Sequence, residues 1–300
     1  MRVAIFGGTG MLGFAVAKAL KLNGFYVDII SRTPEKYLKN KQYQGFNIIK
    51  KLNNSTNYDV CINLGGLSIF RRWNSANKQK FLHSRVCFFD KITDYSLESG
   101  NEFKLIINGS AIGFYPSGND VVDEYSEIEH NNNLFSQQLC LDVERESLTL
   151  QKPANQLINI RTGVVLANEG GFLKRLLPSF KFGFGSIIGD GQQFMSWIDL
   201  SDFCRAVLFI IANKDKFQEL DVINLTSPNF ITNEEFSKEL AKALNKPCLL
   251  KIPKFVVKNL FGQMGVELML GSQKVYPKKL TDAGFKFERG ALGESIKSHI

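Results

Sequence analysis

A glycine-rich loop near the N-terminus constrains the fold of this 300-residue chain more than any other feature. The apolar run at residues 3–6 predicts a β-strand, and residues 7–13 then read GGTGMLG. Apolar residues spaced three and four apart between residues 11 and 20 predict an α-helix. A strand, a tight glycine turn and a helix in this order form the start of a dinucleotide-binding βαβ unit.

Three glycines of this loop have separate expected roles. Gly7 allows the tight turn, Gly10 lets the backbone approach a pyrophosphate, and Gly13 lets the helix pack closely on the strand. The helix N-terminus adds free N–H groups and positive potential for the phosphates. A turn with coincidental glycines is the alternative, and the strand–loop–helix context argues against it. The residues expected to contact the dinucleotide are Gly7, Thr9, Gly10, Met11, Leu12 and Gly13.

The residues that follow the second predicted strand, at 25–30, indicate which dinucleotide binds. NAD enzymes usually have Asp or Glu at this point, where it binds the ribose 2′-OH. This chain has Ser31, Arg32 and Thr33 instead. An arginine can pair with a 2′-phosphate through two N–H groups, and the two hydroxyls can add donors. The sequence therefore predicts NADP(H), with an ordinary loop arginine as the alternative.

A turn of small residues follows the predicted strand at residues 60–64. Such residues would let the ribose on the nicotinamide side lie against the backbone. A simple strand-to-loop turn is the alternative. The residues expected to contact the cofactor here are Asn63, Leu64, Gly65 and Gly66.

Short apolar runs alternate with longer helical patterns through the first half of the chain. Runs that are apolar on both faces are typical of a buried parallel sheet, and their alternation with helices predicts a doubly wound α/β fold of the Rossmann type. The expected strands are residues 3–6, 25–30, 46–49, 60–64, 103–107 and 158–166, and the expected helices are residues 11–20, 74–98 and 131–150.

The pattern changes after residue 167, where glycines become frequent and helices are expected at residues 201–212 and 232–245. We therefore expect an NADP-binding Rossmann domain over residues 1–167. Residues 168–300 are expected to form a smaller C-terminal substrate lobe of mixed α/β structure. This lobe would share an edge of the sheet and would not fold independently.

Composition and charge narrow the class of protein. The five cysteines lie far apart without a CxxC pair, and the three histidines are dispersed, which argues against disulfides and against a metal site. The formal charge of +8 comes from scattered residues without a nucleic-acid-binding motif. Apolar stretches are shorter than a membrane span, and the N-terminal run lacks a signal-peptide cleavage pattern. We expect a soluble cytoplasmic protein that acts on a small molecule, without nucleic acid or membrane as partner, and its oligomeric state stays open.

Further segments are similar to those of a known superfamily. Together with the glycine loop, they resemble the extended short-chain dehydrogenase/reductase superfamily, which holds the NAD-dependent sugar epimerases and dehydratases. The narrower resemblance is to the YfcH-like epimerase-family proteins, including their C-terminal segment of unassigned function. The segments that carry it are residues 72–73 (RW), 110–115 (SAIGFY), 161–166 (RTGVVL), 189–193 (GDGQQ), 197–199 (WID), 277–280 (PKKL) and 284–287 (GFKF).

The resemblance implies a catalytic trio: a Ser or Thr, a Tyr that acts as general acid/base, and a Lys four residues after that Tyr. A phenol with a pKa of about 10 needs a cation beside it to work at neutral pH. Ser110 takes the Ser position, but the register places Ser136 at the Tyr position and Cys140 at the Lys position. Tyr115 is a candidate substitute acid or substrate contact, with a packing aromatic at the pocket rim as the alternative.

The resemblance also places several residues along a substrate cleft. Arg72 and Trp73 could clamp an anionic or planar substrate, or they could be a solvated arginine and a core tryptophan. The chain departs from the YfcH-like group at Leu67, Pro116, Gln192 and Asp199, so the resemblance does not identify the substrate. The residues expected to contact the substrate are Arg72, Trp73, Gln192 and Trp197.

These observations predict an NADP(H)-binding protein with oxidoreductase or epimerase-type activity on an unknown small molecule, such as a nucleotide sugar. The missing Tyr–Lys pair keeps a second class open, a non-catalytic NADPH-binding sensor or regulatory protein. A nucleic-acid binder is a third class, against which the scattered charge argues.

Overall fold

A seven-stranded parallel sheet forms the centre of the structure, a computed structural model that describes residues 1–37, 39–131 and 133–300. Its strand order is β12-β7-β5-β4-β1-β2-β3, so the chain reverses direction across the sheet between β1 and β4. The predicted doubly wound α/β fold is therefore confirmed. The strands are β1 (Arg2–Phe6), β2 (Tyr26–Ile30), β3 (Asn47–Ile49), β4 (Val60–Asn63), β5 (Leu105–Ala111), β7 (Leu157–Thr162) and β12 (Leu220–Leu225).

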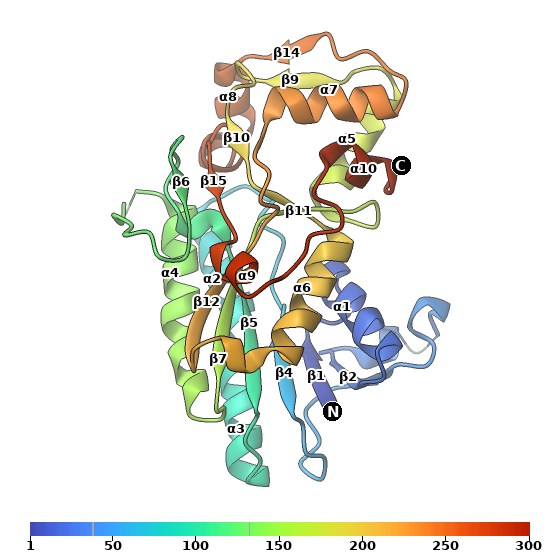
Figure 1. Cartoon of the computed structure of the whole chain (residues 1–300), viewed down its shortest axis with the longest axis vertical. Helices are drawn as coiled ribbons and strands as arrows, with labels where there is room; N and C mark the ends of the chain where they lie inside the picture. Colours follow the sequence, from blue (N-terminus) through green and yellow to red (C-terminus); the bar gives the residue numbers. More distant parts are fainter. Residues whose placement is uncertain (38, 132) are drawn as a thin grey trace.

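Helices cover both faces of this sheet because alternate residues of each strand point to opposite faces (Figure 1). Val3 and Ile5 of β1 pack in the same core as α1 and α6, whereas Ala4 and Phe6 pack with α3. Both sets are buried, which explains why the strands read as continuous apolar runs. The helices around the sheet are α1 (Met11–Leu22), α2 (Ser75–Val86), α3 (Phe89–Ser99), α4 (Phe135–Ser147) and α6 (Leu200–Ala212).

Short elements complete this half of the molecule. They connect the strands and helices of the sheet and lie at its edges. The 3-10 helices are η1 (Pro34–Lys36), η2 (Lys41–Tyr43), η3 (Ile112–Phe114), η4 (Leu148–Gln151) and η5 (Lys214–Lys216), and β6 (Val121–Val122) is a two-residue strand.

The sixth predicted strand, residues 158–166, is interrupted in the structure. Its first part is β7, while its last part, β8 (Val164–Leu166), leaves the sheet and pairs with β11 (Trp197–Asp199). Gly163 lies at the break, where an added Cβ would be 2.8 Å from the main-chain O of Ser196. This close backbone approach redirects the chain toward the C-terminal lobe.

The chain returns to the central sheet beyond residue 167. Helix α6 packs beside α1, and β12 forms the edge strand, paired with β7 along its whole length. The central sheet therefore includes β12, although the expected boundary at residue 167 assigns this strand to the C-terminal lobe. The reason is that β12 is an apolar strand whose partner, β7, offers a free edge.

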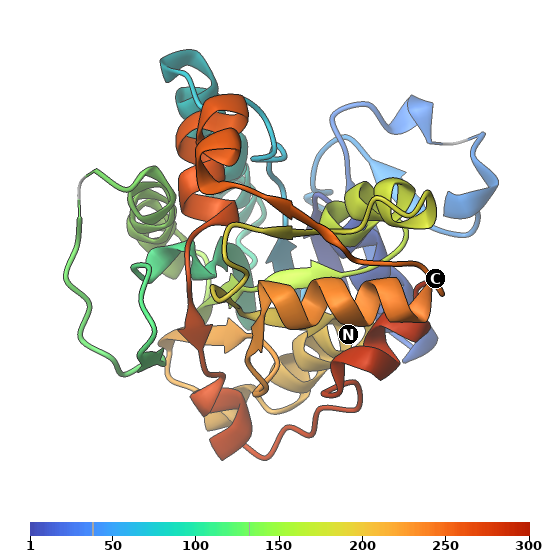
Figure 2. The same ribbon diagram turned by 90° about the horizontal axis from the view of Figure 1, so that it is seen from above.

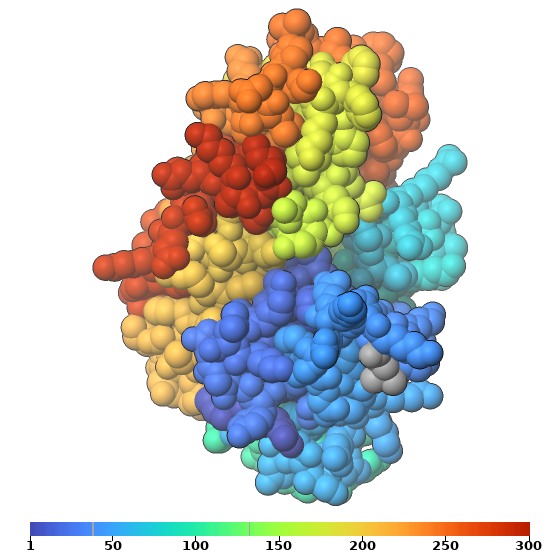
Figure 3. Space-filling view, turned by 90° about the vertical axis from the view of Figure 1, so that its right-hand side faces the viewer, coloured from blue at the N-terminus to red at the C-terminus, as the bar shows by residue number. Residues whose placement is uncertain are grey.

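The C-terminal lobe lies above the carboxyl ends of the strands (Figures 1 and 2). Its core contains Trp197, Phe180 and Phe236. In the space-filling view, α5 lies directly against the first βαβ unit (Figure 3). The elements of this lobe are α5 (Gly171–Lys181), β9 (Ser186–Ile188), β10 (Phe194–Met195), β13 (Ile231–Thr232), α7 (Asn233–Ala243), β14 (Leu250–Ile252), α8 (Lys254–Met264), the π-helical turn η6 (Gly265–Met269), β15 (Lys274–Val275), α9 (Lys278–Asp282) and α10 (Leu292–Lys297).

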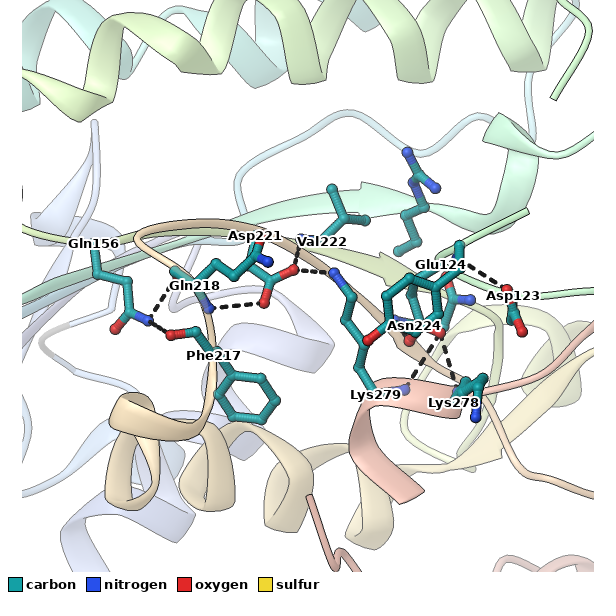
Figure 4. A network of polar contacts seen from close by, with 12 residues as sticks. Asp123, Glu124, Gln156, Phe217, Gln218, Asp221, Val222, Asn224, Lys278 and Lys279 are labelled. Atoms are coloured by element: carbon teal, nitrogen blue, oxygen red, sulfur yellow. Dashed lines mark hydrogen bonds and ion pairs between the residues drawn. The ribbon is translucent and has the colours of Figure 1, made fainter. Parts of the chain in front are cut away.

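The C-terminal segment is anchored on the edge of the sheet through α9 (Figure 4). The Glu124 carboxylate accepts hydrogen bonds from the main-chain N of Asn224 at 2.9 Å and of Lys278 at 3.0 Å. Lys279 forms an ion pair with Asp221 of β12. These contacts join the end of the chain to the edge strand. Among the described residues, none of the helices combines the length and apolarity needed to cross a membrane.

Candidate functional site

A cavity of 390 Å³ lies between the carboxyl ends of the strands and the C-terminal lobe. This is where ligands of open α/β sheets bind. Its walls come from the start of α1, the end of β5, the loop before α2, helix α4, strand β10 and the turn η6. The lining residues that matter below are Met11, Leu12, Ile69, Phe70, Trp73, Arg85, Ser110, Ser136, Leu139, Cys140, Phe172, Met195, Glu267 and Leu268.

The glycine loop has the geometry expected of a phosphate-binding turn. Gly7 has a φ of 75°, and an added Cβ there would be 2.6 Å from the main-chain O of Leu64. The Gly10 N–H donates to the O of Gly7 at 2.9 Å, which closes the turn. A Cβ on Gly13 would be 2.8 Å from the Cα of Gly8. The structure therefore leaves no room for a side chain at Gly7 or Gly13, as the predicted roles of these glycines require.

The N-terminus of α1 is free to bind an anion. Its cap is Gly10, no side chain of the described residues caps it, and its first turn holds no acidic residue. The first N–H groups of a helix are unsatisfied by the helix itself and carry positive potential. Met11 and Leu12 of this turn line the cavity, so the free N–H groups lie at its edge.

The predicted 2′-phosphate residues follow β2, which lies beside β1 in the sheet. Ser31 is buried, and its Oγ accepts a hydrogen bond from the Thr33 N–H at 3.3 Å. Arg32 is exposed and has no ion pair with a carboxylate among the described residues. Because β1 and β2 end side by side, Arg32 lies next to the strand end from which the glycine loop starts.

The Asn63 turn is held by its own side chain. Asn63 is buried, and its Nδ2 donates to Asn108 Oδ1 at 2.9 Å, while its Oδ1 accepts from the Gly65 N–H at 3.2 Å. A Cβ on Gly65 would clash with the ring of Phe88. The side-chain amide of Asn63 therefore fixes the shape of the turn, and the backbone of residues 64–66 forms its surface.

Ser110, Ser136 and Cys140 lie on the wall of this one cavity, as the predicted register requires. The Ser110 Oγ donates to Glu144 Oε1 at 2.7 Å, and Glu144 accepts two further bonds from Arg161, at 2.9 and 2.8 Å. Burial raises the pKa of the Cys140 thiol to about 12, so this side chain is neutral at physiological pH. Cys140 therefore supplies no positive charge, and Ser136 supplies no phenol, at the positions where the resemblance expects a lysine and a tyrosine.

Tyr115 does not lie where a catalytic acid would be needed. It is 2% exposed, and it lies outside the set of residues that line the cavity. Its hydroxyl donates to Asn224 Oδ1 at 2.9 Å and accepts from the guanidinium of Arg161 at 3.1 Å. Burial also raises the pKa of this phenol. The structure therefore favours the alternative, a packing aromatic, because Tyr115 belongs to a small core with Ile112 and Val275.

Of the first two predicted substrate residues, only Trp73 reaches the cavity wall. Its Nε1 donates to the O of Ile69 at 2.9 Å, and its ring packs edge-on against Phe135 at a centroid distance of 4.9 Å. Arg72 is exposed and lies outside the wall. The loop before α2 turns the two neighbouring side chains in different directions.

The other two predicted substrate residues are also corrected. Trp197 is 0% exposed in the core of the C-terminal lobe, where its Nε1 donates to the O of Asn229 at 3.2 Å. Gln192 is exposed and donates to Glu234 Oε2 at 3.1 Å. Neither lines the cavity. The segment between them does, through the three consecutive residues Phe194, Met195 and Ser196.

Two charged cavity residues were not expected from the sequence. Arg85 of α2 lines the wall beside Ser110 and Cys140. Glu267 of η6 lines it from the C-terminal lobe and binds Ser136. The packing of α2 against α4 and the docking of the C-terminal segment bring them there, so no local pattern indicated them.

Comparison with known proteins places this chain among relatives that share its whole length. The Mycobacterium leprae epimerase family protein ML0860 is 37% identical over 98% of this chain and 94% of its own. The Staphylococcus aureus epimerase family protein SAR0825 is 29% identical over 99% and 98%. The crystal structure of the human epimerase family protein SDR39U1 with NADPH is 26% identical, with a TM-score of 0.86 over 99% of this chain and 98% of that one.

A more distant likeness supports the fold alone. The UDP-glucuronic acid 4-epimerase of Bacillus cereus, solved with NAD, has a TM-score of 0.74 at 16% identity, over 100% of this chain and 95% of that one. Residues 252–298 match a domain of unknown function, DUF1731. Residues 3–226 match the NAD dependent epimerase/dehydratase family, to which this chain therefore belongs.

Proposed function

We propose that the protein binds NADP(H) on the glycine loop and uses it to reduce or oxidise a small molecule in the 390 Å³ cavity. The observation that carries this proposal is that the uncapped start of α1 and Ser110 line the same cavity. A dinucleotide fits the loop, because a Cβ on Gly7 or Gly13 would meet backbone atoms. When bound, NADPH supplies a hydride.

Two observations favour NADP(H) over NAD(H). Arg32 follows β2, next to the strand that leads into the glycine loop, and its guanidinium has no carboxylate partner among the described residues. An acidic residue, which would repel a 2′-phosphate, is missing from residues 31–33. The human relative of known structure was solved with NADPH.

The cofactor preference is tested with Arg32→Ala. We expect the affinity for NADPH to fall about 10-fold or more, because a charge-assisted bidentate contact is lost, while the affinity for NADH stays unchanged. Titration of protein fluorescence with each cofactor measures both constants. Lys36→Ala, an exposed cation of η1, is the matched control. Equal affinities of the unaltered protein for NADH and NADPH would contradict the preference.

The cavity favours a substrate with an apolar body. Ile69, Phe70, Trp73, Leu139 and Phe172 form much of its wall. Arg85 is the one cation on the wall among the described residues. A nucleotide sugar would place two phosphates and many hydroxyls against these apolar side chains, which costs desolvation free energy. A carbonyl compound with an aromatic or aliphatic body suits these walls better.

Within this cavity, Ser110 is the group suited to orient a carbonyl. Its hydroxyl donates to Glu144, and the bidentate ion pair with Arg161 fixes that carboxylate. Rotation of the Oγ–H toward the cavity would donate a hydrogen bond to a carbonyl oxygen. The Glu144–Arg161 pair therefore positions Ser110 without contacting the substrate.

A second candidate function is a non-catalytic NADPH-binding sensor. The neutral Cys140 thiol and the Ser136 hydroxyl favour it, because neither can replace a tyrosine activated by a lysine. NADPH consumption with a panel of apolar aldehydes, ketones and nucleotide sugars separates the two functions. Turnover that disappears in Ser110→Ala supports an enzyme, whereas tight NADPH binding without turnover on any compound supports the sensor.

A further inference from the structure

Helix α2 brings a positively charged side chain into the cavity near its C-terminal end. Arg85 lines the wall together with Ser110 and Cys140. Its NH1 donates to the O of Phe81 at 2.9 Å, and its NH2 donates to the O of Leu67 at 3.3 Å. A guanidinium has five N–H donors, of which these bonds use two. No carboxylate of the described residues forms an ion pair with it.

Arg85 lies against the turn that follows β4. Its main-chain O accepts a hydrogen bond from Asn63 Nδ2 at 3.2 Å, and a Cβ on Gly66 would be 3.3 Å from its Cζ. The same turn packs on the glycine loop, because a Cβ on Gly7 would be 2.6 Å from the Gly65 N. The guanidinium therefore lies beside a backbone that touches the phosphate-binding loop.

The charge of Arg85 lacks compensation in this position. Burial lowers the pKa of its guanidinium, which shows that the charged form is poorly solvated. Its neighbour on α4, Cys140, is a neutral thiol. Arg85 is partly buried, and a partly buried charge without a counter-charge is stabilised by oxygen acceptors, which a ligand can supply from the cavity side.

We propose that Arg85 binds the ribose on the nicotinamide side of NADP(H), donating hydrogen bonds to its hydroxyl oxygens. The inference rests on the proposed function, since it requires a dinucleotide on the glycine loop. In this proposal, the cation that binds the ribose comes from α2. The resemblance to short-chain dehydrogenases instead expects a lysine on α4, at the position that Cys140 occupies. A carboxylate of the substrate is the competing ligand for the same donors.

The test uses three ligands that differ in the parts of the cofactor they contain. NADPH contains both riboses, 2′-phospho-ADP-ribose retains the second ribose without nicotinamide, and adenosine 2′,5′-bisphosphate lacks the second ribose. Calorimetric titration gives the dissociation constant of each for the unaltered protein, Arg85→Gln and Arg85→Lys. Arg71→Gln, an exposed arginine of the preceding loop, is the matched control.

We expect Arg85→Gln to weaken NADPH and 2′-phospho-ADP-ribose by about 10-fold each, and to leave adenosine 2′,5′-bisphosphate unchanged. Arg85→Lys should recover part of the loss, because it keeps the charge. Unchanged binding of NADPH overturns the inference and leaves the proposed function intact. An equal loss for all three ligands also overturns it, since that result indicates a disturbed fold. If the unaltered protein binds none of the three ligands, the result contradicts the proposed function itself.

Discussion

Single residues decide whether the nucleotide site exists, and the glycine loop shows this most directly. Gly7 combines a φ of 75° with a backbone neighbour 2.6 Å from the position of a Cβ. Gly24, in the turn after α1, has a φ of 80° but no atom within 4 Å of that position. Substitutions at the two glycines can therefore separate the free-energy cost of a strained φ from that of a steric clash.

This contrast gives a prediction at the residue scale. We expect Gly24→Ala to lower the free energy of unfolding by about 1 kcal/mol, from the strained φ alone. Gly7→Ala should lower it by about 2–4 kcal/mol and abolish NADPH binding, because the loop must move away from the Leu64 backbone. Urea denaturation and NADPH titration of both variants measure these effects. Equal losses of stability in the two variants would show that the close approach does not matter.

Arg85 is a site residue that cannot be recognised from the sequence alone. In the sequence, it is an arginine on a helix with few buried residues, and nothing separates it from Arg71 or Arg72. Its place in the cavity depends on which face of α2 packs against α4. The sequence therefore indicated the glycine loop, because its conformation depends on neighbouring residues. It did not indicate the cavity cation Arg85, because the position of that side chain depends on tertiary packing.

At the scale of elements, the start of α4 depends on the C-terminal segment. Glu267 of η6 accepts hydrogen bonds from the Phe135 N at 3.1 Å, the Ser136 N at 2.8 Å and the Ser136 Oγ at 2.7 Å. The helix has no side-chain cap from its own N-cap residue, Leu134. A carboxylate that binds the first N–H groups replaces that cap and matches the helix dipole.

This cap gives a prediction at the element scale. Glu267→Gln removes the negative charge, so we expect the free energy of unfolding to fall by about 1–2 kcal/mol. Hydrogen exchange should become faster at the amides of residues 135–137 and stay unchanged in α1. Glu239→Gln, in a partly exposed pair with Lys242 on α7, is the control. Unchanged protection of the α4 amides would argue against the capping role.

The whole molecule is joined by contacts between the central sheet and the end of the chain. Asp199 is buried at the start of α6, where its carboxylate contacts the Ser201 N–H at 2.7 Å, Ser295 Oγ at 2.6 Å and His299 Nε2 at 3.0 Å. Burial by itself raises the pKa of this carboxyl, but the hydrogen bonds from His299, Ser295 and Ser201 outweigh it and hold the pKa at about 2. The charged carboxylate thus links α10 to α6.

This pKa leads to a prediction at the scale of the molecule. A carboxyl whose pKa is lowered on folding adds stability above its unfolded pKa, and that stability is lost as the pH falls through the folded value. We expect the stability advantage over Asp199→Asn to be constant above pH of about 5 and to shrink by about 2 kcal/mol on approaching pH 2. Urea denaturation across this range measures it. Asp215→Asn, at an exposed side chain, should show no such change relative to the unaltered protein.

The sequence predicted most of the central sheet, because buried parallel strands and the helices between them have strong apolar patterns. Two strands are exceptions. The expected strand at residues 158–166 is broken at Gly163 by the approach of Ser196, and the edge strand β12 was not expected from the sequence. Of the site, the loop and the placement of Ser110, Ser136 and Cys140 on one wall were predicted. Tyr115 and Trp197 were misplaced, because aromatic residues in a motif can serve packing as well as binding.

By itself, the sequence determined the glycine loop, most of the order of strands and helices, and the serine and cysteine at the positions where the resemblance expects a tyrosine and a lysine. All of these depend on neighbours within a few residues, where steric limits and periodicity act. Only the tertiary structure decided which charges reach the cavity, because that depends on segments far apart in the chain. Glu267 meets Ser136 across 131 positions, and Arg85 reaches the cavity through the packing of α2. Such contacts arise when apolar faces pack together, and no local pattern specifies the partner that packing brings.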